Sequence, residues 1–184
     1  MTFSHPADVA TRLVRAAREL ADRAGNASFT VAQVTDTAGA SLKSFYRHFG
    51  SKDELLLALI EDDSRRGAAA LEARMARRRD PLRGFVEELF AMLSLPGAAG
   101  YAGVLVREYD RLAEHYPEQL DVALAPLTSM LANLLATPDP KRDAHTMFGV
   151  LIGGIRDVVL GRVDDVAEHA RYLHRFCTRG LEDR

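Results

Sequence analysis

The chain has 184 residues, 47% of them apolar, which is enough for a hydrophobic core and for one or two small domains. Its formal net charge of −2 excludes a uniformly basic surface as a source of affinity for nucleic acid. The single cysteine, Cys177, excludes an intrachain disulfide and favours a cytosolic protein. The longest strongly apolar run, 147–155, is too short to span a bilayer, so we expect no membrane partner.

Almost every segment has the apolar spacing of an amphipathic helix, and the alternation typical of strands is missing. Capping residues, glycines and prolines mark where the helices begin and end. They predict an all-α fold of about nine helices, in which a three-helix head (1–50) precedes a helical bundle (51–184). The expected helices cover about 7–23, 31–38, 42–49, 51–79 (linking head and bundle), 81–94, 101–115, 117–134, 141–161 and 164–181.

Residues 29–56 carry the most specific signal in the chain. Thr30 and Gln33 have capping-box spacing at the start of one short helix, and Gly39 suits the tight turn that ends it. Ser41 then caps a second short helix, and two such helices joined by a short turn predict a helix-turn-helix. The second of these helices has no acidic residue but carries Lys43 and Arg47, as expected of a helix that enters the major groove.

These residues resemble the N-terminal signature of the TetR family of bacterial transcriptional regulators. The shared positions are the Thr cap, a Val, Ala-Gly, the Ser cap, Tyr-x-x-Phe and Ser-Lys-x-x-Leu, here at Thr30, Val34, 38–39, Ser41, Tyr46, Phe49, 51–52 and Leu55. The chain departs from that pattern at Ala32, Thr35, Leu42 and Lys43. These departures leave the fold intact but prevent any operator sequence from being borrowed from a relative.

The resemblance implies a DNA-binding surface on the head. It implies that Leu42, Lys43, Ser44 and Arg47 face base edges, and that Tyr46, His48, Lys52 and Thr30 hold phosphates. It also implies a homodimer that binds a palindromic double-stranded DNA operator, more often as a repressor than as an activator. Such a protein is cytoplasmic and lies on the nucleoid when bound to DNA.

Two further surfaces are expected in the bundle. Small and apolar residues in the last two helices predict a self-complementary dimer interface, as in the family: Val150, Gly153, Gly154, Val166, Ala170, Leu173 and Cys177. The alternative is that this stripe belongs to the protomer's own core. The resemblance also implies a cavity for a small, largely apolar effector, with candidate lining residues Met92, Tyr101, Leu105, Tyr109, Met130 and Phe148.

No set of residues in the sequence indicates catalysis, a metal site or a cofactor, so we expect no enzyme. His169 and His174 are five positions apart and do not share one face of a helix, and no glycine-rich phosphate loop follows a strand. Two alternatives stay open at this point. The bundle could be a protein-interaction module with an inactive head, or the protein could bind DNA without any effector pocket.

Overall fold

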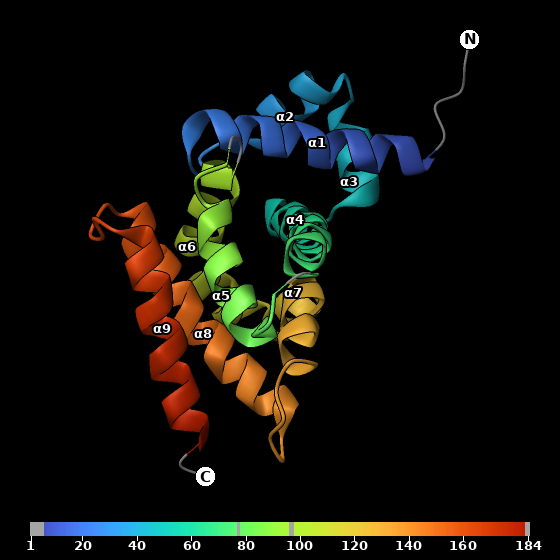
Figure 1. Ribbon diagram of the computed structural model, residues 1–184. Helices are drawn as coiled ribbons and strands as arrows, with labels where there is room; N and C mark the ends of the chain where they lie inside the picture. Colours follow the sequence, from blue (N-terminus) through green and yellow to red (C-terminus); the bar gives the residue numbers. More distant parts are fainter. Residues whose placement is uncertain (1–5, 77, 96–97, 183–184) are drawn as a thin grey trace.

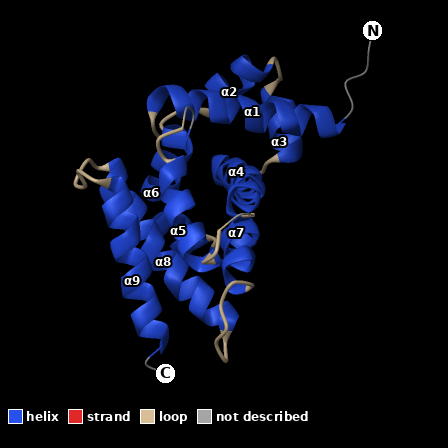
Figure 2. Cartoon of the chain, viewed as in Figure 1, coloured by secondary structure: helices blue, strands red, loops and turns tan. Residues whose placement is uncertain are grey.

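The computed structural model describes residues 6–76, 78–95 and 98–182, and all regular structure in these ranges is helical (Figure 2). The all-α prediction is therefore confirmed. The helices are α1 (Pro6–Ala24), α2 (Val31–Ala38), α3 (Leu42–His48), α4 (Lys52–Met75), α5 (Pro81–Met92), α6 (Ala98–His115), α7 (Pro117–Ala132), α8 (Pro140–Val159) and α9 (Val166–Glu182).

Local sequence accounts for most of the helix boundaries. Thr30 and Gln33 form the predicted capping box of α2, and Gly39 ends that helix with a left-handed φ of 59°. Ser41 caps α3 by accepting a hydrogen bond from the backbone N–H of Ser44. Asp80 caps α5 in the same way, and Pro81 occupies the first helical position, where its missing N–H is harmless.

Six predicted boundaries are wrong by two to four residues, and three of these are the early ends of α5, α7 and α8, by two residues each. α4 ends at Met75 rather than at residue 79, and Asp80 serves as the cap of α5. α6 begins at Ala98 rather than at residue 101, and α9 begins at Val166 rather than at residue 164. Asp165 stands before α9 and accepts a hydrogen bond from the N–H of Glu168, which fixes the start of that helix.

The helices pack around two hydrophobic cores. Figure 1 shows α1, α2 and α3 lying across one end of a bundle formed by the later helices, with α4 leading from the head into the bundle. Leu55, Leu56 and Leu59 of α4 are buried in the head core. Ile60 and Leu71 of the same helix are buried in the core of the bundle. One helix therefore contributes to both cores and ties them together.

α6 also crosses from the bundle into the head. Its Val104 is fully buried among the side chains of the head core, whereas Leu105, the next residue, is buried in the core of the bundle. Within the bundle, α4 packs on α5, α6 and α7, α5 also packs on α9, α6 also packs on α7, and α8 packs on α6, α7 and α9. The head thus rests on α4 and α6, and these two helices set its position relative to the bundle.

Candidate functional site

The turn between α2 and α3 gives α3 one buried face and one outward face. Phe45 is fully buried and Phe49 nearly so, and their ring centroids are 5.7 Å apart. Together with Val34 of α2, these rings anchor α3 on the head core. Side chains on the opposite side of α3 must therefore point into solvent.

The outward face of α3 carries the residues that the sequence singled out for DNA. Leu42 is 50% exposed and Tyr46 is 60% exposed. Lys43 and Arg47 are exposed as well, and neither has an ion-pair partner among the residues that the structure describes. Two unpaired cations and an exposed phenol on one short helix suit contact with a nucleic acid.

Three further predicted contacts lie beside this face: Thr30, which caps α2, and the less exposed Ser44 and His48. The Thr30 hydroxyl accepts a hydrogen bond from the Gln33 N–H at 3.2 Å and, in return, the Thr30 N–H donates to Gln33 Oε1 at 2.8 Å. Ser44 and His48 are half-buried. The exposed start of α2, where backbone N–H groups point outward, is therefore well ordered and favourable for an anion.

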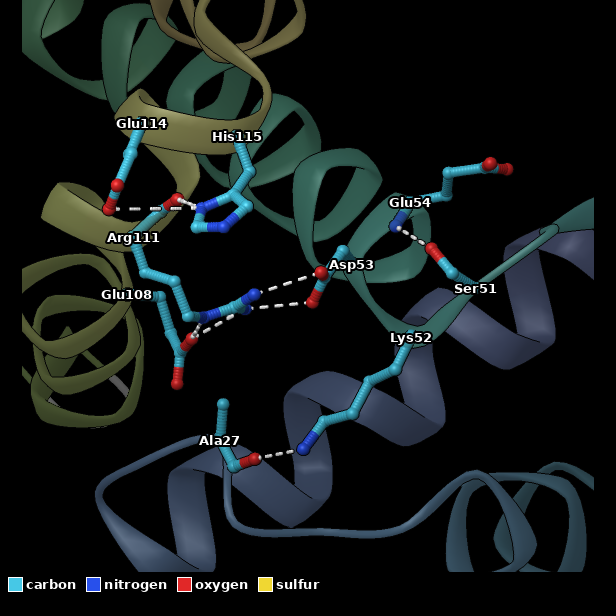
Figure 3. A network of polar contacts seen from close by, with 9 residues as sticks. All are labelled: Ala27, Ser51, Lys52, Asp53, Glu54, Glu108, Arg111, Glu114 and His115. Carbon is cyan, nitrogen blue, oxygen red and sulfur yellow. Dashed lines mark hydrogen bonds and ion pairs between the residues drawn. The ribbon is translucent and has the colours of Figure 1, made fainter.

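Lys52 behaves differently from the other predicted phosphate contacts. Its Nζ donates to the carbonyl oxygen of Ala27 at 2.5 Å (Figure 3). The same Nζ lies 4.9 Å from the centroid of the Phe29 ring. Partial burial lowers the pKa of Lys52, while the negative charge of Glu108 acts in the opposite direction. The structure therefore directs Lys52 toward the loop before α2, away from the row formed by Lys43 and Arg47.

A cluster of charged residues joins the head to the bundle beside Lys52. Arg111 of α6 donates two hydrogen bonds to the Asp53 carboxylate, at 2.8 and 2.7 Å, and also contacts Glu108 (Figure 3). The hydrogen bonds from Arg111 hold the pKa of Asp53 below its ordinary value. Sequence reasoning missed this contact because Arg111 and Asp53 are 58 positions apart and no local motif connects them.

Two glycines let α6 approach the end of α1 very closely. A methyl group added at Gly103 would overlap the carbonyl oxygen of Gly25 and lie 2.9 Å from its carbonyl carbon. A methyl group added at Gly100 would lie 2.5 Å from the Cα of Asp22. Both obstructing groups belong to backbone, which cannot rotate aside. Only glycine therefore fits at these positions without separating α6 from the head.

The residues predicted to line an effector cavity lie in or against the core of the bundle. Leu105 and Phe148 are buried, and Met92, Tyr109 and Met130 are half-buried against the same cluster. Burial raises the pKa of the Tyr109 hydroxyl, and the nearby carboxylates of Asp121 and Asp110 add to that effect. The Tyr101 side chain lies outside the described residues. None of the other five side chains lines the hollows between α8 and α9, between α5 and α9, or between α4 and α7.

The apolar stripe predicted as a dimer interface packs largely inside the protomer. Ala170, Leu173 and Cys177 of α9 are buried, and a methyl group at Gly154 of α8 would overlap Leu173. Val150, Gly153 and Val166 are only partly buried. The physical reason is that α9 packs on both α5 and α8, so its most regular stripe is needed within the chain.

A second apolar surface on α8 and α9 is exposed instead. Tyr172 is 53% exposed and Phe176 57% exposed, and their rings stack with centroids 6.3 Å apart. They border a hollow of about 550 Å³ between the two helices, which Met147 and Val150 also line. The sequence carried a signal for this surface, since two aromatic residues four positions apart on a polar helix face are unusual.

Two kinds of feature are absent from the described residues. No helix among them is both long and apolar enough to cross a membrane. Within the same ranges, no three His, Cys, Asp or Glu side chains are grouped so that they could hold a metal ion.

The chain is similar to known proteins in fold and, in its head, in sequence. No curated protein matches the chain. A TetR transcriptional regulator from Rhodococcus sp. RHA1 has 19% identity and a TM-score of 0.70, with 94% of each chain covered. FadR from Bacillus subtilis, solved with stearoyl-CoA, has 15% identity and a TM-score of 0.70, covering 91% of this chain and 96% of its own. RolR, solved with resorcinol, has 23% identity and a TM-score of 0.68, covering 93% of this chain and 88% of its own.

The match to a protein family covers the head of the chain. Residues 13–59 match the family described as bacterial regulatory proteins, tetR family. This range contains most of α1, all of α2 and α3, and the start of α4, which together form the helix-turn-helix and its support. The resemblance seen in the motifs and the match of the head agree, and the bundle has the fold of solved regulators of that family. The head therefore matches the tetR family of bacterial regulatory proteins, and the chain as a whole has the fold of solved structures described as TetR regulators.

Proposed function

We propose that the protein is a homodimeric repressor that binds a palindromic DNA operator through α3 and is released by a small, largely apolar effector. The observation that carries the proposal is the outward face of α3, where Lys43 and Arg47 are exposed and unpaired among the described residues. A cationic side chain without an ion-pair partner can contact a DNA phosphate or a base edge. Here the helix that carries it is anchored on the head core. Because its partner is DNA, the protein would act in the bacterial cytoplasm, on the nucleoid.

Within this proposal, α3 divides its contacts between bases and backbone. Leu42, Lys43, Ser44 and Arg47 face base edges, since the first residues of a recognition helix and those one turn later reach into the groove. Tyr46 and His48 contact phosphates of the DNA backbone. Thr30 places the start of α2 against a further phosphate. Lys52 would have to leave the Ala27 carbonyl to reach a phosphate, so we assign it to the junction between head and bundle.

The dimer forms through the exposed side of α8 and α9. Tyr172 and Phe176 supply the aromatic surface, and Gly149 and Gly153 have no atoms near the position of an added methyl group, so a partner helix can approach there. The buried stripe of Ala170, Leu173 and Cys177 supports this surface from behind. Two heads held in this way can reach two half-sites on one face of the DNA.

An effector in the bundle would act on the head through α6. This helix is buried in both cores at Val104 and Leu105, touches α1 at Gly103 and binds α4 through Arg111. A ligand that displaces α6 would therefore move or release the head, provided it binds the two arrangements with different affinity. Relatives with the same fold were solved with stearoyl-CoA and with resorcinol, which supports a ligand with apolar surface.

The experiment is a binding titration against the DNA upstream of the protein's own gene, over a series of salt concentrations. Wild type is compared with a Lys43→Ala/Arg47→Ala variant. Its matched control is Lys141→Ala/Arg142→Ala, which removes one lysine and one arginine from exposed positions at the start of α8. Wild type and control should bind with steep salt dependence, because bound phosphates release counterions. The α3 variant should lose about thirtyfold or more in affinity, since two good base contacts of about 1–3 kcal/mol each contribute at least about 2 kcal/mol.

The alternatives give different results in the same titration. Equal and weak binding by all three proteins would contradict the DNA-binding assignment and favour a protein-interaction module. Specific binding that no apolar small molecule weakens would favour a regulator without an effector. An apolar compound that lowers the affinity of wild type for the operator would support the full proposal.

A further inference from the structure

A small basic hollow lies between α5 and α9, away from the head. It has a volume of about 210 Å³ and is lined by Asp80, Arg83, Arg171, His174 and Arg175. The two helices pack along each other, so the first turn of α5 and the middle of α9 hold these side chains in place. Three arginines and a histidine around one aspartate make an excess of positive charge.

The acidic groups around the hollow are already engaged. The Asp80 carboxylate accepts a hydrogen bond from the Arg83 N–H at 3.0 Å, because Asp80 is the cap of α5. Its other oxygen lies 4.0 Å from Nε2 of His174, whose side chain is only 15% exposed. The Arg83 guanidinium is paired with Glu87 at 2.7 Å.

Arg171 and Arg175 are the side chains that lack a counter-charge. They are one turn apart on α9, and neither forms an ion pair with an acidic group in the described part of the chain. Asp80 lines the same hollow, and Glu87 and Glu88 line a neighbouring one with Arg171, but the ion pairs that these three carboxylates form are with other side chains. Two like charges at this spacing repel and destabilise a helix slightly. A bound anion would remove that repulsion, whereas water would only screen it.

We propose that this hollow binds a small oxyanion, either inorganic phosphate or the phosphate group of a metabolite. A guanidinium presents donors in a planar fork that matches phosphate oxygens, and these charge-assisted hydrogen bonds are among the stronger ones in proteins. The volume exceeds the roughly 30 Å³ that one water occupies in the liquid several times over, so a tetrahedral anion fits together with some water. This site does not depend on the DNA-binding proposal, because it uses no residue of the head.

The position of Arg175 connects the site with the proposed dimer surface. Arg175 lines this hollow and also the larger one between α8 and α9, beside Tyr172 and Phe176. A bound anion would therefore neutralise charge at the edge of the aromatic surface. Phosphate should then favour association of the protomers, an effect that chloride at equal ionic strength does not reproduce.

The test is isothermal titration calorimetry of the full chain with sodium phosphate, against a background of sodium chloride at equal ionic strength. The site variant is Arg171→Ala/Arg175→Ala. The control, Arg107→Ala/Arg142→Ala, removes two exposed guanidinium groups that form no ion pair among the described residues. A third variant, Arg171→Lys/Arg175→Lys, keeps the two positive charges but loses the planar guanidinium groups. Circular dichroism checks that each variant is folded.

Wild type and control should each bind one phosphate per protomer. The alanine variant should lose at least about tenfold in affinity, and the lysine variant should fall between them because it keeps point charges without the fork. Adenosine 5′-monophosphate is the second probe: equal affinity identifies the phosphate group alone as the ligand, and tighter binding identifies a phosphorylated metabolite. Equal binding by wild type and the alanine variant, or no binding by wild type, would overturn the proposal.

Discussion

Replacing Gly103 with alanine tests whether the contact between α6 and α1 holds the head in place. In an ordinary helix, glycine to alanine stabilises by about 1 kcal/mol. At Gly103 the added methyl group would overlap the Gly25 carbonyl group, which is backbone and cannot turn away. α6 must then move away from α1, which also disturbs the fully buried Val104 next to it. We expect overpacking of this kind to cost about 1–3 kcal/mol.

Gly67→Ala is the matched control for this variant. Gly67 also lies inside a helix, α4, but an added methyl group would make only an ordinary contact at 3.9 Å from Leu127 Cδ2. This variant should therefore keep the gain of about 1 kcal/mol in helix stability. The two variants should differ by about 1–3 kcal/mol, which in a chain of this size is a difference of roughly 2–12 °C in Tm.

The assay is thermal unfolding followed by far-UV circular dichroism, at one protein concentration because the protein is expected to dimerise. Gly103→Ala should melt below wild type and Gly67→Ala at or above it. The DNA titration described above then gives a second readout, since a displaced head should bind the operator more weakly. If Gly103→Ala melts as high as Gly67→Ala, the close approach of α6 to α1 does not constrain the protein and the reasoning is refuted.

Three further predictions concern other surfaces. Tyr172→Glu/Phe176→Glu should shift the protein from dimer to monomer in sedimentation velocity, because it places charges in an apolar interface; an unchanged dimer would exclude this face as the contact. Arg111→Met should make stability less sensitive to acid. The lowered pKa of Asp53 contributes stability that is present above about pH 4 and lost as the pH falls through the lowered value, so melting curves of wild type and variant should converge in acid. Lys52→Met should lower the Tm and leave the slope of DNA affinity against salt unchanged; a slope reduced by about one unit would instead show that Lys52 binds a phosphate.

Local signals were enough to predict the helices of the head. A threonine, a serine and a glycine at fixed spacings determine where α2 and α3 begin and end, and each acts on hydrogen bonds within a few residues of itself. The exposed face of α3 followed equally directly, because burial of Phe45 and Phe49 leaves only one direction for Lys43 and Arg47. Such features depend on short stretches of chain, which sequence patterns describe well.

Features that depend on distant parts of the chain were not predictable in this way. Apolar spacing shows that α9 has a buried stripe, but it cannot show whether the buried side faces the same protomer or a second one. The structure places Ala170, Leu173 and Cys177 inside, and the exposed aromatic residues lie on another face of the helix. In the same way, the family motif marks Lys52 as a phosphate contact, while its actual partner at Ala27 is 25 positions away.

The burial of Val104 in the head core has a consequence for engineering chimaeric regulators. A fragment that ends after α4 would contain all three head helices and still lack a side chain that completes their packing. The empty position would leave a cavity, and cavities of that kind destabilise a small core by a few kcal/mol. Grafting this head onto another helical bundle therefore requires the first two turns of α6 to be transferred with it, including the glycines that face α1. The natural exchange unit is two pieces of sequence, separated in the chain and joined only in the folded molecule.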